Sequence, residues 1–254
     1  MSVRGFLSSA ALLLVLAGCA RALPPPRQPV SEDARRAIAL LVARWRDFSD
    51  LRTLADIRLQ RGGERQALTG VLLAKAPASV RFEALSPLGQ ALLLVTIHDG
   101  QLTAYNVASN EAVIGPATAD TAARVLKLPF DPDDLVGVLA GRAVPPKDLR
   151  VAELLPPDEH GRSLELIGRI NRQRVWMDFE NGVVRRVEIT GGRYEARVTY
   201  LRDTDGRPVG FDLSAAQAYL TGSVRYRDPV FDAGIEADRF HFTVPESAKI
   251  ERLH

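Results

Sequence analysis

Two stretches of this sequence are apolar at consecutive positions rather than at alternate ones: Val71-Leu72-Leu73-Ala74 and Ala91-Leu92-Leu93-Leu94-Val95. Both are short, rich in aliphatic residues and close to glycine or proline, which is typical of strands. A strand with one face in water alternates apolar and polar side chains, so these strands must be covered on both faces. Helices can cover one face, and the other is either covered by something else or lines an apolar cavity.

Period-two patterning extends over most of the chain, from residue 51 to 107 and from 149 to 226. The dipeptides Asp99-Gly100, Asn181-Gly182 and Gly191-Gly192 fall between such runs and predict tight hairpins. We count about eleven strands, the last at Phe240–Val244. The pattern predicts a mainly β domain with some helix (α+β), built as one antiparallel meander.

Three helices are predicted. The first follows Ser31, a good N-cap, and its apolar residues recur at three- and four-residue steps as far as Phe48. The other two cover residues 118–128 and 132–140. The acids at the start of the third helix suit its N-terminus better than a metal site, because they lack histidine and calcium-loop spacing.

The N-terminus has the layout of an export signal: Arg4, an apolar run from Phe6 to Ala17, and small residues before Cys19. Leu16-Ala17-Gly18-Cys19 resembles a bacterial lipobox, which implies cleavage before Cys19 and its lipidation with acyl chains such as palmitate. The alternative is an ordinary signal peptide with an incidental cysteine. Ala20 after the cysteine implies sorting to the outer membrane, with the protein facing the periplasm.

The domain boundaries follow from this reading. Residues 1–18 are predicted to be the signal peptide and residues 19–30, rich in proline, an extended tether of roughly 30 Å. Residues 31–254 then form one domain of ordinary globular composition, with 46% hydrophobic and 25% charged residues.

The usual catalytic and metal-binding patterns are not found in the sequence. The four histidines, His98, His160, His241 and His254, are not at zinc-ligand spacing, and there is no nucleophile elbow, phosphate loop or dinucleotide fingerprint. A net charge of +2 does not favour nucleic acid as a partner. We therefore expect no enzyme activity, no metal and no cofactor.

Two segments resemble the LolA/LolB superfamily of lipoprotein carriers, and the outer-membrane receptor LolB in particular. Phe82-Glu83-Ala84-Leu85-Ser86-Pro87-Leu88-Gly89 is similar to a family strand that leads into a Pro-Leu-Gly loop. Residues 128–141 resemble a family loop and helix, although Val138 replaces the tryptophan of that motif. The ending at residues 240–245 is closer to uncharacterised lipoproteins of the superfamily.

The resemblance implies an unclosed half β-barrel with helices as a lid over an apolar cavity. It also implies that Leu88, with Pro87 and Gly89, forms a loop that touches the membrane. Candidates for the cavity lining are Phe82, Leu92, Leu94, Tyr105, Trp176 and Phe179.

Two functions follow from the resemblance. One is a monomeric lipoprotein that receives acyl chains or lipoproteins, from a periplasmic carrier among other donors, and delivers them to the outer membrane. The other is an assembly lipoprotein of the same fold with a closed core. A cavity below about 300 Å³ would favour the second.

Overall fold

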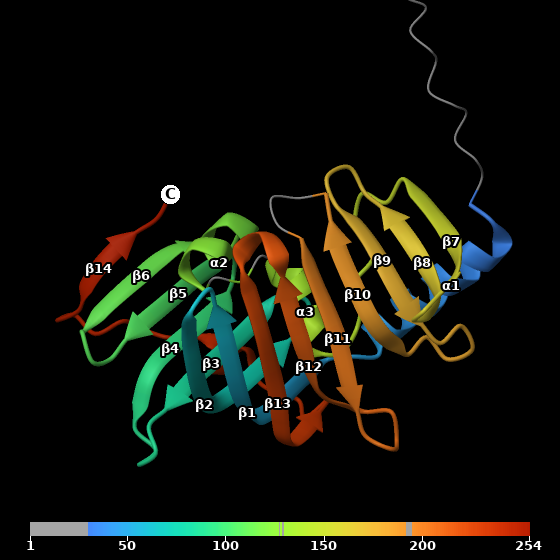
Figure 1. The fold of residues 1–254 in the computed structure, drawn as a ribbon. Helices are drawn as coiled ribbons and strands as arrows, with labels where there is room; N and C mark the ends of the chain where they lie inside the picture. The colour runs from blue at the N-terminus through green and yellow to red at the C-terminus, as the bar shows by residue number, and fades with distance from the viewer. Residues whose placement is uncertain (1–29, 127, 129, 192–194) are drawn as a thin grey trace, which may run out of the picture.

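The computed structural model describes residues 30–126, 128, 130–191 and 195–254. Cys19 and the predicted signal and tether up to residue 29 lie outside this part of the chain. Within it, the strands form one sheet in the order β14-β6-β5-β4-β3-β2-β1-β13-β12-β11-β10-β9-β8-β7 (Figure 1). The two edge strands, β14 and β7, do not pair with each other, so the curved sheet is an unclosed half-barrel, as predicted.

The strands are β1 (Asp50–Arg61), β2 (Glu64–Lys75), β3 (Ser79–Leu85), β4 (Ala91–His98), β5 (Gln101–Asn106), β6 (Glu111–Pro116), β7 (Val151–Asp158), β8 (Gly161–Ile167), β9 (Arg172–Met177), β10 (Val184–Thr190), β11 (Ala196–Arg202), β12 (Pro208–Ala215), β13 (Leu220–Phe231) and β14 (Lys249–Arg252). The helices are α1 (Glu32–Arg46), α2 (Ala119–Val125) and α3 (Pro132–Leu139), and the short 3-10 helices are η1 (Ala216–Ala218) and η2 (Ala237–Phe240).

The hairpin turns come from residues that accept a left-handed backbone. Asp99 and Gly100 have φ of 48° and 74° and join β4 to β5 with His98 directly opposite Gln101. This is the two-residue turn that matches the twist of the flanking strands. The Asp99-Gly100 dipeptide predicted this turn, and each neighbouring pair from β1 to β6 is antiparallel.

The helices cover the inner face of the sheet. The Ser31 side chain accepts a hydrogen bond from the Ala34 backbone N–H at 3.2 Å and starts α1, which packs against β7. Helix α3 packs against β2 and β3, and α2 against β5 and β6 (Figure 1). Every residue of α3 from Leu135 to Leu139 is buried, so this helix is enclosed on all sides.

The C-terminal segment covers the outer face of the sheet at β2, β3 and β4. Leu72 belongs to the main core on the inner face, whereas its neighbour Leu73 packs with Ile235 and Phe240. We call residues 232–245 the strap. The strap explains why β2 and β4 are apolar on both faces: each face has its own cover.

The strap begins at a buried carboxylate. Asp50, which is fully buried, accepts hydrogen bonds from the backbone N–H groups of Ala233, Gly234 and Ile235 at 2.8–3.1 Å. Three donors on one carboxylate satisfy its charge without water, which a buried acid requires. The crossing from β13 onto the outer face is thereby fixed.

The prediction of a last strand at Phe240–Val244 was wrong, and fourteen strands are present in the described residues instead of about eleven. Phe240 ends η2, and the strap then crosses β3 instead of running beside it. The carbonyls of Arg239 and His241 accept hydrogen bonds from the Arg81 guanidinium, not from a neighbouring strand. The last strand is β14, which pairs in parallel with β6.

Candidate functional site

An apolar cavity of about 820 Å³ lies between the sheet and the segment that carries α2 and α3. The sheet contributes side chains from β1 to β4, β12 and β13, and the helical segment contributes residues between 125 and 139. Its volume falls within the range of about 300–1,000 Å³ that is usual for small-molecule sites. Most of the lining is aliphatic, with two phenylalanine rings, Phe82 and Phe211, on the sheet side and Phe130 on the helical side.

The strand period decides which residues reach the cavity. On β4, Leu93 and Val95 line it, and on β3, Val80 and Phe82 do so. Successive side chains of a strand point to opposite faces, so the residues between these positions face the strap.

The cavity opens at one end of the sheet. Four of its lining residues are polar and exposed, and all four lie at the β1–β2 hairpin: Arg61, Glu64, Arg65 and Gln66. Among the described lining residues, these include every ionisable group, so the interior of the cavity carries no charge. An apolar chain can enter without meeting a charge, while a polar head group would remain at the basic rim.

Two exposed apolar side chains stand at the same end of the sheet. The register places the β3–β4 loop and the β12–β13 turn on the side of the β1–β2 hairpin, since Thr69 pairs with Leu85 and Arg61 with Leu220. Leu88 in the first loop is 87% exposed, and Tyr219 in the second is 80% exposed.

The Leu88 loop is a tight turn. The Gly89 N–H donates to the Ser86 carbonyl at 2.8 Å, and the Ser86 N–H donates to the Gln90 carbonyl at 2.8 Å. Gly89 has φ of 79°, a conformation that strains residues with a Cβ. Pro87 and Gly89 therefore hold a loop from which Leu88 points into solvent.

The C-terminal end of α3 is fixed to the sheet by buried polar groups. The Tyr226 hydroxyl donates to the Leu139 carbonyl at 2.8 Å, and the Arg202 guanidinium donates to the Gly141 carbonyl at 2.7 Å. Burial raises the pKa of the Tyr226 hydroxyl well above its ordinary value, so it stays a donor. The helix is thus held at its C-terminal end, where Val138 and Leu139 line the cavity.

The N-terminal end of α3 carries a titratable group of unusual affinity for protons. Burial, with the nearby Asp131 and Asp133 carboxylates, raises the pKa of Asp134 to about 7. Lys147 pairs with Asp133 and opposes this effect only in part. The Asp134 carboxyl accepts a hydrogen bond from the Gln173 side-chain amide at 3.4 Å.

Of the six residues predicted to line the cavity, only Phe82 does so. Leu92 and Leu94 are on the opposite face of β4, because the prediction chose the wrong alternation of that strand. Tyr105, beside Leu94 in the ladder, packs its ring against Phe242 of the strap, with ring centroids 5.6 Å apart.

The last two residues that were wrongly predicted to line the cavity, Trp176 and Phe179, lie in the β7–β12 half of the sheet. Trp176 is buried on the outer face, where its indole N–H donates to Asp158 and Arg174 stacks on its ring at 4.4 Å. Phe179 packs at the edge of the main core under Arg162, whose guanidinium lies 5.1 Å from the ring centre. An aromatic residue in a strand sequence does not reveal which face it takes.

The sequence reasoning also missed most of the lining. Leu93, Leu213 and Leu220 sit in strands that were predicted, and only the choice of face was lacking. The sequence did not mark Arg61 and Arg65 as residues of the cavity rim, because charged residues beside a glycine turn are common on any hairpin.

Comparison with known proteins rests on structure alone. No family model and no curated protein matches this sequence. Solved structures match this chain over most of their own length. One is a domain described as an outer membrane lipoprotein-sorting protein from Vibrio parahaemolyticus, 15% identical, with a TM-score of 0.58, over 82% of this chain and 95% of that one. Another is a LolA superfamily protein from Nitrosomonas europaea, 14% identical, with a TM-score of 0.56, over 81% and 97%.

The chain has the LolA-type fold. A DUF1329 family protein from Desulfovibrio piger shares it as well, at 13% identity and a TM-score of 0.55, over 84% of this chain and 98% of that one. Identities this low establish the LolA-type fold and leave function to the residues of this chain. None of the helices in the described ranges is long and apolar enough to cross a membrane.

Proposed function

We propose that this chain is a lipid-anchored envelope protein that takes acyl chains or lipoproteins into its LolA-type cavity and delivers them to the outer membrane. The observation that carries the proposal is the apolar cavity of about 820 Å³ under α3. Burial of one CH₂ group is worth about 0.8 kcal/mol, so a chain of ten carbons gains several kcal/mol in such a site.

The size of the cavity supports a carrier over an assembly protein. A core packed shut would leave less than about 300 Å³, the lower limit of ordinary ligand sites. The aliphatic lining and the uncharged interior suit a flexible hydrocarbon chain.

The arrangement at the open end supports delivery to a membrane. Leu88 and Tyr219 are exposed at the end of the sheet where the cavity opens. When they contact a bilayer, the cavity opening faces the lipid, and the chain can pass across without crossing water. The anchor is assigned to Cys19, which lies outside the described residues, on the resemblance of its sequence to a lipobox.

A matched pair of variants on β4 tests the cavity. Leu93, half-buried, lines it, whereas the adjacent Leu92 faces away. Titration with a fluorescent fatty acid should give saturable binding to the unaltered protein. Leu93→Arg places a charge in the apolar site and should weaken binding at least tenfold, about 1.4 kcal/mol, and Leu92→Arg should leave it unchanged.

A different result in this titration would favour the assembly function over the carrier function. An unaltered protein that does not bind the fatty acid, or equal loss in both variants, would favour a non-catalytic assembly lipoprotein that binds another envelope protein. Thermal melts of both variants separate loss of the site from loss of the fold.

A further inference from the structure

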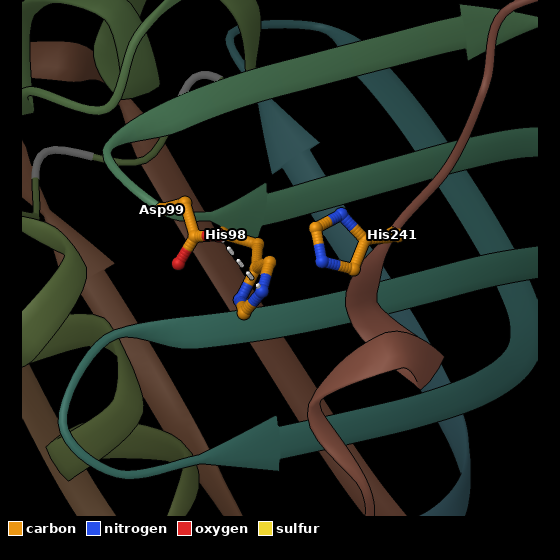
Figure 2. Close-up of side chains that lie close together, drawn as sticks. All are labelled: His98, Asp99 and His241. Carbon is orange, nitrogen blue, oxygen red and sulfur yellow. Dashed lines mark ion pairs between the residues drawn. The ribbon is translucent and has the colours of Figure 1, made fainter.

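Two histidines from distant parts of the chain lie beside a carboxylate at the end of the sheet opposite the cavity opening. His98 is the last residue of β4, Asp99 begins the β4–β5 turn, and His241 comes from the strap (Figure 2). One potential ligand atom from each of these residues lies within 4.8 Å of the others. The His98 and His241 rings are 4.6 Å apart between centroids.

The hydrogen bond of His98 leaves one ring nitrogen for a ligand. Its Nδ1 is 2.9 Å from the Ser79 hydroxyl, and its Nε2 is 3.4 Å from an oxygen of Asp99. When Nδ1 carries the proton and donates it to Ser79, Nε2 keeps its lone pair. Metal-bound histidines are oriented in this way by a polar group at the second nitrogen.

The charges around the cluster allow a cation. Asp99 is exposed and contributes a negative charge. Arg81 on β3, which donates to the carbonyl of His241, pairs with Glu83, and Arg239 in the strap is exposed to water. The charge of Arg81 is therefore compensated and that of Arg239 is screened by water, so the histidine rings remain available.

We propose that His98, Asp99 and His241 bind a divalent transition-metal ion of the Zn²⁺ type. Zn²⁺ takes histidine nitrogen and carboxylate oxygen at about 2.0–2.2 Å, which puts neighbouring ligands of a tetrahedron about 3.4 Å apart. His98 and Asp99 already have this spacing, and His241 reaches it by a side-chain movement of about 1.4 Å from the 4.8 Å limit. Water completes the shell, since Asp99 and His241 are exposed.

The bound ion would fasten the strap to the sheet. Phe240 and Ile235 pack on Leu73 at the start of the strap, and Asp50 holds its first turn. The metal would add a clasp between the β4–β5 turn and the residue after η2. This role does not depend on the cavity or on its cargo.

The test uses the protein without a histidine tag, freed of metal with a chelator and titrated calorimetrically with ZnCl₂. One Zn²⁺ per chain is expected, with binding at least tenfold weaker in His241→Ala and in Asp99→Asn. His160→Ala is the matched control, because His160 also stands beside an acid, Glu159, but its Nε2 faces the Arg186 guanidinium. Mg²⁺ is expected not to replace Zn²⁺ at the same concentration, because it prefers oxygen ligands.

Hydrogen exchange supplies the second readout. Zn²⁺ should slow exchange of the backbone N–H groups in residues 237–245 of the unaltered protein and not of His241→Ala. Absence of stoichiometric binding, or equal loss in His160→Ala and His241→Ala, would overturn the site. Binding without protection of residues 237–245 would overturn the clasp.

Discussion

Leu88 is the most exposed of the large apolar side chains in the described part of the chain, at 87%. Nothing in its own loop covers it, while Pro87 and Gly89 hold the turn that presents it. Transfer of a leucine side chain to an apolar phase is worth about 1.5–3 kcal/mol, enough to bias a hand-off and too little to anchor a protein. We interpret Leu88 as the contact through which cargo leaves.

Leu88→Glu is therefore expected to keep the melting temperature and the fatty-acid affinity of the unaltered protein, and to slow transfer of cargo to liposomes about tenfold. Val230→Glu is the control, because Val230 is also exposed but lies at the other end of the sheet, opposite Arg52. Unfolding of the Leu88 variant would place this residue in the core, and normal transfer would remove it from the delivery step.

We predict that Cys19 is the site at which the lipid anchor is attached. Cys19→Ser should abolish incorporation of an alkyne-labelled fatty acid, because a hydroxyl does not replace the thiol in lipobox processing. The variant should then stay uncleaved or separate from membranes. Label on the serine variant would show that the acyl chain is attached elsewhere.

At the scale of the element, proton binding at the N-terminal end of α3 affects the stability of the fold. Folding raises the pKa of Asp134 from 3.8 to about 7. Between about pH 4 and pH 7 the folded carboxyl keeps a proton that the unfolded one releases, so the folded state loses stability as the pH rises through this window.

Denaturant unfolding at pH 5 and pH 8 measures this effect. The free energy of unfolding should fall by about 2 kcal/mol more in the unaltered protein than in Asp134→Asn, less than the full shift implies because Asp134 keeps some contact with water. Asp205→Asn, in the exposed β11–β12 turn, should behave like the unaltered protein. Equal pH dependence in all three would mean that Asp134 is ionised in the folded state.

Turns and helix starts were predicted correctly where a few neighbouring residues determine them. Asp99-Gly100 and Asn181-Gly182 mark turns, and Ser31 caps α1 as expected. The face of β4 was not predictable, because Ala91 to Val95 is apolar at every position and both alternations fit. The strap was missed for a similar reason: Phe240–Val244 alternates like a strand, but only the distant Arg81 and Leu73 determine where it lies.

On the scale of the whole molecule, one curved sheet has different partners on its two faces. Helix α3 and the cavity occupy the inner face, and the strap covers the outer face of β2 to β4. The sequence required both faces to be covered, but the assignment of each face depends on contacts between residues far apart in the chain. The same holds for the His98 and His241 pair.

The central claim is that acyl chains occupy the cavity under α3, and photo-crosslinking tests it most directly. A fatty acid with a diazirine near its methyl end is bound to the protein, irradiated, and the adducts are mapped by mass spectrometry. We predict adducts on inner-face residues such as Leu72, Phe82, Leu139 and Phe211, all of which line the cavity. Adducts confined to the outer face, at Leu94 or Trp176, or none above background, would contradict the account.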